Sequence, residues 1–285
     1  MSEDQENKSS LPPQESETEK PQDQQQSLVK AEKQSPEPVG ASLKTKVGIG
    51  FGLALGAAVL GSLVIFRLMN RIKVDGLENI PTGHENVLYC LNHNSVLDNF
   101  AFETAVYMPK IFFHPDYIPV NLADRKNFFG DPSSPKLKDR VLRVLGKYFF
   151  THLRAYPVDR KTGDLGQVDK WIELLKNNIV VVFPEGTRSR TGEIGQGKPG
   201  VGKMIYNARP IVIPVRMIGM DEVLGVGRII PRAFHTIHII IGKPLDLSNL
   251  LDQPLAENET EQISHFREIA NQVVEAIRAL TPGKK

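Results

Sequence analysis

The sequence predicts one α/β domain over residues 71–285, with a mostly parallel sheet flanked by helices. From about Arg71 onward, short runs rich in β-branched residues alternate with longer segments of helical spacing. Strands separated by helices favour a parallel sheet that is covered on both faces. The roughly 215 residues of this region suffice for one such domain, and the sequence contains no internal repeat.

The elements follow from these patterns in chain order. The apolar run at 85–91 predicts a buried strand, and 95–108 predicts the helix that follows it. Helical spacing recurs at 164–176 and at 259–280. Further strands are expected at 177–183, 210–218 and 235–241.

The N-terminal residues differ in composition from the rest of the chain. Residues 1–40 hold 9 acidic and 4 basic residues, whereas residues 41–285 hold 24 acidic and 31 basic ones. Because this acidic segment has almost nothing to bury, we expect a disordered polar tail over 1–43. A transit peptide would be rich in Arg and poor in acids. The single Cys90 excludes an internal disulfide.

An uncharged run of 20 residues, from Val47 to Phe66, follows the tail. A helix of this length covers about 30 Å, the thickness of a bilayer's hydrocarbon core. We therefore predict a membrane-anchoring helix over 44–70, hence a membrane protein with a single N-terminal anchor and its α/β domain on the cytoplasmic side. Basic residues flank both ends, so they hardly discriminate the orientation. A segment that dips into one leaflet, or a buried core helix, is the alternative.

Two polar stretches follow predicted strands. The stretch "NHNSVLD" follows the strand that ends near Leu91, and "PEGTRSR" follows the strand that ends at Phe183. Active sites of open α/β sheets lie at the carboxyl ends of strands, so these stretches are the candidate site.

His93 and Asp98 are the candidate acid–base pair. Five residues apart on one helix, they would lie about 140° apart around the axis. They can meet if His93 precedes a helix that starts at Ser95, with Ser95 and Asp98 forming a capping box. Asp98 would then orient the imidazole, whose other nitrogen takes a proton. The alternative is that Asp98 only caps the helix and His93 is a polar loop residue.

Four sequence blocks in order resemble the glycerolipid acyltransferases, specifically the 1-acylglycerol-3-phosphate acyltransferase family. The blocks are "NHNSVLD", "YPVDR" (156–160), "FPEGTRS" (183–189) and "PIVIPV" (210–215), and the likeness runs from about Gly76 to about Pro244. Two departures concern the second block. Arg154 stands where the family often has glycine, and Pro157 replaces a usual apolar residue.

The resemblance implies transfer of a fatty acyl group from acyl-CoA or acyl-carrier protein to the hydroxyl of lysophosphatidate at a membrane, giving phosphatidate. It implies His93 as general base, oriented by Asp98, with Arg160 and Arg188 contacting the phosphate. No cofactor or metal is expected, because a thioester is already an activated acyl donor. The acceptor-binding loop would comprise Glu185, Gly186, Thr187 and Arg188, and Lys198 can extend to the same phosphate.

Rival interpretations concern the same stretches. "GKPGVGK" (197–203) opens like a nucleotide-binding loop, but Met204 stands where Ser or Thr should ligate magnesium, so a helix start is favoured. The segment 136–154 predicts either an ordinary surface helix or a basic amphipathic helix on anionic lipid; nucleic acid is not an expected partner. Another lysophospholipid, glycerol phosphate or an aminolipid is an alternative acceptor. A non-catalytic lipid-binding protein and a nucleotide-hydrolysing membrane protein are alternatives of other classes.

Overall fold

The structure is a computed structural model that describes residues 49–131, 133–158 and 166–283. The predicted tail over 1–43, the first residues of the predicted anchor (44–48) and Arg160 lie outside the described residues.

The strands of the described residues form one seven-stranded sheet, in the order β1-β7-β6-β2-β5-β3-β4. Every neighbouring pair is parallel except β6 and β7, which run antiparallel. The mostly parallel sheet predicted from the sequence is therefore confirmed. The strands are β1 (Arg71–Asp75), β2 (Val87–Leu91), β3 (Val120–Asp124), β4 (Ala155–Val158), β5 (Ile179–Val182), β6 (Ile211–Ile218) and β7 (Thr236–Ile241).

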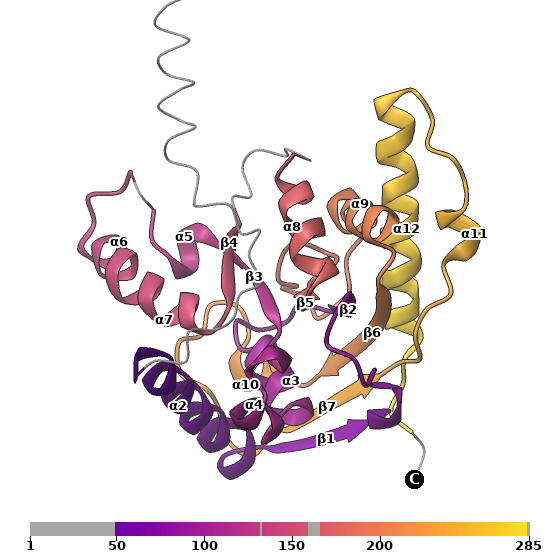
Figure 1. Cartoon of the computed structure of the whole chain (residues 1–285). Helices are drawn as coiled ribbons and strands as arrows, with labels where there is room; N and C mark the ends of the chain where they lie inside the picture. Colours follow the sequence, from indigo (N-terminus) through magenta and orange to yellow (C-terminus); the bar gives the residue numbers. More distant parts are fainter. Residues whose placement is uncertain (1–48, 132, 159–165, 284–285) are drawn as a thin grey trace, which may run out of the picture. The chain divides into compact units, whose positions relative to one another are not determined.

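Helices cover both faces of this sheet, and Figure 1 shows α8, α9 and α12 together on one side of it. The predicted helices at 95–108, 164–176 and 259–280 correspond to α3, α8 and α12, within a few residues at each end. The helical elements are α2 (Ile49–Leu63), η1 (Val64–Leu68), η2 (Leu77–Asn79), α3 (Asp98–Val106), α4 (Lys110–Phe113), η3 (Pro115–Tyr117), α5 (Arg125–Phe128), α6 (Leu137–Val141), η4 (Leu142–Gly146), α7 (Lys147–His152), α8 (Gly166–Lys176), α9 (Pro199–Ala208), α10 (Met220–Leu224), α11 (Ser248–Leu251) and α12 (Glu259–Ala279).

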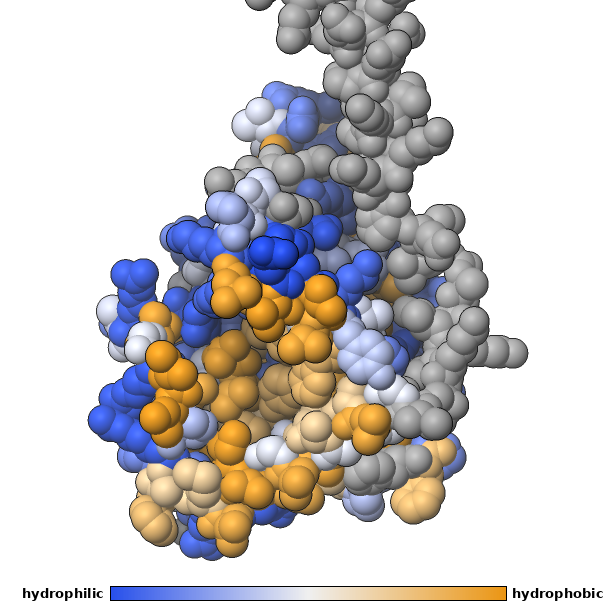
Figure 2. Space-filling model, turned by 90° about the vertical axis from the view of Figure 1, so that its left-hand side faces the viewer, coloured by the Kyte–Doolittle hydropathy of each residue, from blue (hydrophilic) through white to orange (hydrophobic). Residues whose placement is uncertain are grey.

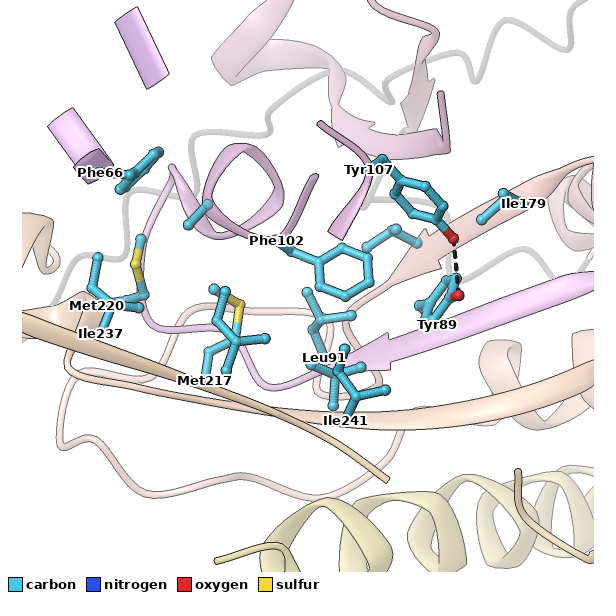
Figure 3. Close-up of a cluster of buried hydrophobic side chains, with 14 of the residues drawn as sticks. Phe66, Tyr89, Leu91, Phe102, Tyr107, Ile179, Met217, Met220, Ile237 and Ile241 are labelled. Carbon is cyan, nitrogen blue, oxygen red and sulfur yellow. Dashed lines mark hydrogen bonds between the residues drawn. The ribbon is translucent and has the colours of Figure 1, made fainter. Parts of the chain in front are cut away.

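The main hydrophobic cluster lies between the sheet and α3. Alternate residues of β2 point to this side, so Tyr89 and Leu91 pack with Phe102 of α3. Figure 3 shows the hydroxyl groups of Tyr89 and Tyr107 pointing toward each other, and their oxygens are 2.9 Å apart. This hydrogen bond satisfies two polar groups that would otherwise be costly to bury. The cluster thus fixes α3, whose first turn carries Asp98, against the centre of the sheet.

The uncharged run contributes to this cluster instead of standing apart from it. Leu55 of α2 and Phe66 of η1 are buried with the strand residues, and α2 packs against α3 and α7. Asn70 ends the segment by donating from its Nδ2 to the carbonyl of Ile65 at 2.9 Å and to that of Arg232 at 2.9 Å. The described part of α2 has 15 residues and is followed directly by the π-helix η1. Among the described residues no helix is long and apolar enough to cross a membrane, so the spanning helix predicted over 44–70 is not found there.

Two glycines bring α9 into close contact with α12. A methyl group added to Gly202 would lie 1.8 Å from the carbonyl oxygen of Phe266, and one added to Gly197 would lie 2.6 Å from the carbonyl carbon of Ala270. Stretch 197–203 is therefore the loop and first turns of a packed helix, α9, as the favoured interpretation expected. No described strand leads directly into it, in contrast to a nucleotide-binding loop.

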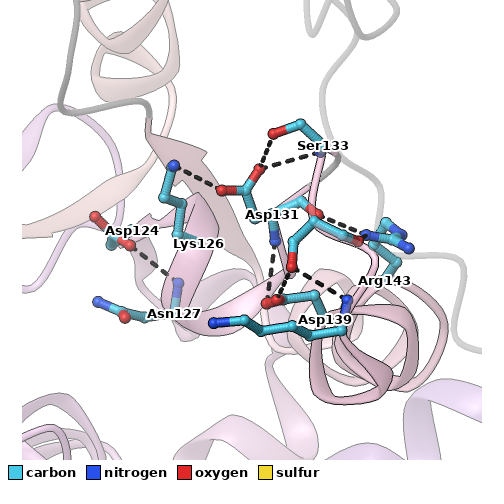
Figure 4. A network of polar contacts seen from close by, with 9 residues as sticks. Asp124, Lys126, Asn127, Asp131, Ser133, Asp139 and Arg143 are labelled. Atoms are coloured by element: carbon cyan, nitrogen blue, oxygen red, sulfur yellow. Dashed lines mark hydrogen bonds and ion pairs between the residues drawn. The ribbon is translucent and has the colours of Figure 1, made fainter.

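The segment between β3 and α7 is held by a polar network around Asp131 and Asp139, shown in Figure 4. The Asp131 carboxylate accepts from Lys126 Nζ at 2.6 Å, and the Asp139 carboxylate accepts from Ser134 Oγ at 2.5 Å. Arg143 donates to the backbone carbonyl of Asp131 at 2.5 Å. These bonds join the end of α5 to the start of α6. They fix the course of the chain that leads through η4 into α7.

Candidate active site

The two polar stretches predicted from the sequence meet at the carboxyl edge of the sheet. β2 and β5 are parallel neighbours, with Leu88 opposite Val180 and Cys90 opposite Val182. Both strands are fully buried because neither face of the central sheet is open to water. The loops that follow them therefore emerge side by side, and each loop reaches the other.

His93 and Asp98 form the predicted pair. Nδ1 of His93 lies 2.9 Å from Oδ2 of Asp98, and both residues are buried, with Asp98 wholly inaccessible. The same carboxylate oxygen accepts from the backbone N–H groups of Asn94 at 2.8 Å and Ser95 at 2.9 Å. Burial raises the pKa of the Asp98 carboxyl, and the hydrogen bonds from His93, Ser95 and Asn94 oppose that rise. The carboxylate therefore holds both the imidazole and the loop that carries it, which is more than a helix cap does.

The helix starts later than the sequence predicted. α3 begins at Asp98, not at Ser95, and residues 96–97 form a turn. Half of the predicted capping box is present, because the Ser95 N–H donates to the Asp98 side chain. The other half is absent, since Ser95 Oγ accepts from the Leu97 N–H at 3.2 Å instead. The extra turn places Asp98 at the helix N-terminus, where it reaches back to His93.

Two asparagines fix this loop on β6. Asn92 pairs with the backbone of Met217 in both directions, with its Nδ2 donating at 2.9 Å and its Oδ1 accepting at 2.7 Å. Asn94 adds a longer contact of 3.4 Å from its Nδ2 to the same carbonyl. β2 ends at Leu91, and the side-chain amide of Asn92 continues the hydrogen bonding to β6 one residue beyond that end. Asn92 was not predicted as a site residue, although a buried asparagine directly after an apolar strand is a signal for such a role.

The second loop clamps the peptide of His93 from both sides. Glu185 is buried, and its Oε1 accepts from the His93 N–H at 3.0 Å while its Oε2 accepts from the Gly195 N–H at 2.7 Å. The Ser189 N–H donates to the carbonyl of His93 at 2.7 Å. Phe183 stacks on the imidazole, with ring centroids 3.7 Å apart and planes 15° apart. Both carboxylate oxygens of Glu185, which was predicted to bind the acceptor, accept hydrogen bonds from backbone N–H groups. Glu185 therefore holds the two loops of the site together.

The remaining residues of the predicted acceptor loop are more open. Gly186 has φ 70°, a left-handed conformation that favours glycine, and Lys198 covers the space a Cβ would take, at 3.2 Å from its Cγ. The Lys198 N–H donates to the carbonyl of Pro184 at 2.8 Å, which ties α9 to the loop. The side chains of Thr187 and Lys198 are exposed.

A cavity of about 110 Å³ joins His93 to Arg188. One part of its wall is polar, and the other part is aromatic and aliphatic. Among the described residues, neither Arg188 nor Lys198 forms an ion pair. The lining residues are His93, Val96, Asn99, Phe100, Asn121, Leu122, Ala123, Asp124, Asn127, Phe128, Phe150, Phe183 and Arg188.

The aromatic part of the cavity was not predicted. Phe128 ends α5 and Phe150 lies in α7, and their rings meet edge to face with centroids 5.0 Å apart. The sequence showed apolar spacing around Phe150, but nothing in it indicated that this helix would lie against the carboxyl edge of β3. The structure therefore brings together His93, Asp98 and Arg188, with Glu185 behind them, whereas Arg160 lies outside the described residues.

Residues 71–218 match a family model described as Acyltransferase. This match covers more than half of the chain and contains the His93–Asp98 pair together with the loop from Glu185 to Arg188. The chain therefore belongs to the acyltransferase family, and the resemblance predicted from the four sequence blocks is confirmed at that level.

The individual relatives carry a more specific name. This chain is 26% identical to the chloroplastic 1-acyl-sn-glycerol-3-phosphate acyltransferase of Arabidopsis thaliana over 179 residues, which are 61% of this chain and 44% of the relative. Its likeness to the corresponding chloroplastic protein of Brassica napus is also 26%, over 60% of this chain and 44% of the relative. A probable 1-acyl-sn-glycerol-3-phosphate acyltransferase of Mycoplasma genitalium is 34% identical over 30% of this chain and 31% of the relative. The chain thus spans less than half the length of the two plant relatives.

A solved structure shows the same fold. The crystal structure of the 1-acyl-sn-glycerophosphate acyltransferase PlsC from Thermotoga maritima superposes with a TM-score of 0.51 at 19% identity. The superposition covers 82% of this chain and 81% of the other.

Proposed function

We propose that this protein transfers a fatty acyl group from acyl-CoA or acyl-carrier protein to the free hydroxyl of 1-acylglycerol-3-phosphate, which gives phosphatidate. The observation that carries the proposal is the imidazole of His93, held through Nδ1 by Asp98 in the wall of a cavity that also contains Arg188. The names of the similar proteins support the same acceptor.

The proposed chemistry uses the nitrogen of His93 that Asp98 leaves available. Nε2 removes the proton from the acceptor hydroxyl while its oxygen attacks the thioester carbonyl carbon. The C–S bond then breaks, and the departing thiolate takes the proton back from Nε2. Asp98 stabilises the imidazolium between these two steps. The two clamping bonds on the His93 peptide keep the ring in place throughout.

The charge around the cavity suits the phosphate of the proposed acceptor. A guanidinium offers a planar fork that matches two phosphate oxygens, so Arg188 is the side chain we assign to it. Lys198 packs over Gly186 and supplies a second positive charge near the loop. Arg160, which the resemblance also assigns to the phosphate, remains part of the proposal.

The apolar part of the cavity suits an acyl chain. Phe100, Leu122, Phe128 and Phe150 line it, and burying methylene groups against such side chains contributes about 0.8 kcal/mol per CH₂. Because both acceptor and product are lipids, we place the reaction at a membrane.

The test is turnover by the detergent-solubilised chain, with a panel of acceptors and both classes of acyl donor. His93→Ala should lower the rate by about 10²–10⁴-fold while circular dichroism shows an intact fold. His114→Ala is the matched control, because His114 is exposed and does not line the cavity. Full turnover by the His93 variant would reject the assignment, and preference for glycerol phosphate or an aminolipid would reject the acceptor alone.

A further inference from the structure

The three most exposed large apolar side chains of the described residues belong to one loop. Ile229 is 93% exposed, Ile230 80% and Phe234 96%, all between α10 and β7. Isolated exposed apolar residues need no explanation, but three of this size on one loop are unusual for a surface that only faces water.

The loop is held firmly against the turn that ends η1. The Asn70 side chain donates to the carbonyl of Arg232 at 2.9 Å and accepts from the His235 N–H at 2.9 Å. The Phe234 N–H donates to the carbonyl of Met69 at 2.7 Å. These bonds fix the base of the loop on both sides of Phe234, so its apolar side chains are presented by a braced backbone.

Apolar side chains continue from this loop across neighbouring elements. Leu68 precedes Met69, whose carbonyl accepts from the Phe234 N–H, and its side chain is exposed. Leu60 is an exposed side chain of α2. α2 packs against α7, whose Tyr148 is half exposed. Figure 2 shows apolar side chains gathered over the side of the molecule that carries α2, α6 and α7. We call this surface the apolar face; it comprises Leu60, Leu68, Leu137, Val144, Leu145, Tyr148, Ile229, Ile230 and Phe234.

Basic residues surround the apolar face. Arg228 and Arg232 flank the exposed isoleucines, and Arg67 precedes Leu68. Fewer acidic residues lie nearby. Glu222 pairs with His235, and the Asp139 carboxylate accepts a hydrogen bond from Ser134. Asp221 has no ion pair among the described residues. None of the basic residues that follow forms an ion pair within the described part of the chain. The exposed basic residues of this surface are Arg67, Lys136, Lys138, Arg140, Lys147, Arg228 and Arg232.

We propose that the apolar face docks on a bilayer that contains anionic lipid, with Ile229, Ile230 and Phe234 entering the boundary between headgroups and acyl chains. A surface with exposed apolar side chains ringed by Lys and Arg has the chemistry of an interfacial anchor. A second copy of this chain would bring the same positive charges together, so charge complementarity favours the lipid surface.

The position of the face relative to the cavity is consistent with this partner. Phe150 lines the cavity, and Tyr148, two residues earlier in α7, belongs to the apolar face. One short helix therefore contacts both surfaces. Docking would place the cavity wall near the acyl chains, although lipid binding itself needs neither substrate nor turnover.

The experiment places an environment-sensitive fluorophore at Ile230→Cys in the full chain. Cys90 is fully buried, so the introduced thiol is the one that reacts. Adding vesicles of phosphatidylcholine and phosphatidylglycerol should shift the emission to the blue, and brominated acyl chains should quench it. Leu77→Cys is the matched control, because Leu77 is also apolar and exposed but lies beyond the other end of β1; it should show neither change.

A second pair of variants tests the charge. Arg228→Ser combined with Arg232→Ser should weaken binding to phosphatidylglycerol vesicles by about tenfold or more, and binding to neutral vesicles much less, because each basic residue near an anionic surface contributes roughly 1 kcal/mol. The proposal is overturned if vesicles leave the emission at position 230 unchanged. It is also overturned if the emission is already blue-shifted in buffer without vesicles. A blue shift at all protein concentrations would mean that another part of this chain covers the loop, and a blue shift only at high concentration would mean that a second copy does. Because no acyl substrate is present, these outcomes are independent of the proposed reaction.

Discussion

Arg154 occupies a backbone conformation that glycine adopts more readily. Its φ is 55°, and its guanidinium donates to the carbonyl of Ile118 at 2.7 Å and to the side chain of Asn178. The chain passes through this left-handed region directly before β4. In this protein the cost of that conformation, of order 1 kcal/mol, is offset by hydrogen bonds inside the protein.

Arg188 should act on the binding of the acceptor more than on the rate. Its guanidinium shares the cavity with His93 but lies outside the hydrogen bonds that position the imidazole. Arg188→Ala is therefore expected to raise KM for lysophosphatidate, with a smaller change in kcat, since the phosphate remains bound as the acyl group moves.

Steady-state kinetics with lysophosphatidate as the varied substrate measure this effect. Arg190→Ala is a matched control, because Arg190 is exposed on the same loop and does not line the cavity. An unchanged KM together with a reduced kcat in the Arg188 variant would contradict the assignment.

The sequence predicted which residues of the two loops would lie together, but not every contact that each of them makes. The His93–Asp98 pair followed from spacing and from placement at a strand end. Glu185 was predicted to bind the acceptor, yet its carboxylate accepts from two backbone N–H groups of different loops. Such a role depends on which peptides lie nearby in space, and no spacing within one loop reveals it.

The elements were predicted where hydrophobic periodicity is strong. Strands β2, β5, β6 and β7 lie in nearly uninterrupted apolar runs of the sequence. β1, β3 and β4 were missed because polar residues such as Lys73 and Asn121, or a proline (Pro157), interrupt their apolar pattern. Pairing with a neighbouring strand, rather than local pattern, makes these segments strands.

The packing of α9 on α12 predicts different effects for two glycines of one helix. A methyl group at Gly202 would overlap the backbone of Phe266, whereas a methyl group at Gly200 would make an ordinary 3.5 Å contact with Val168. Gly202→Ala should lower the free energy of unfolding by about 2 kcal/mol or more. Gly200→Ala should be neutral or slightly stabilising, because alanine favours a helix over glycine.

Urea denaturation of the two variants beside the parent measures this difference in the midpoint. Equal midpoints for the two variants would mean that α9 can move away from α12 without cost, contrary to the close packing described above.

At the scale of the whole molecule, a largely buried carboxyl group makes stability depend on pH. Glu103 of α3 accepts from Asn121 Nδ2 at 2.7 Å, and burial raises its pKa to about 7, against a hydrogen bond from Asn121 and the charge of Arg154 that lower it. Between about pH 4.5 and pH 7 the folded protein keeps a proton that the unfolded chain has released. This contribution to stability is therefore fully present below about pH 4.5 and is lost as the pH rises to about 7.

Glu103→Gln should remove this dependence, because the amide stays neutral while its oxygen can still accept from Asn121. At pH 8 we expect the variant to be more stable than the parent by about 1–3 kcal/mol, with little difference at pH 4.5. Denaturation midpoints measured from pH 4.5 to pH 8 give the comparison. Parallel curves for the two proteins would show that Glu103 does not titrate in this window.

The burial of Leu55 and Phe66 has a practical consequence for anyone who wishes to handle this protein without detergent. A chain shortened to start at Arg71 would lose the apolar segment and, with it, two side chains of the hydrophobic core. Their loss would leave a cavity that water or a neighbouring molecule must fill. Replacing only the exposed Leu53, Leu60 and Leu68 by polar residues would reduce the apolar surface that promotes aggregation and leave the buried side chains unchanged.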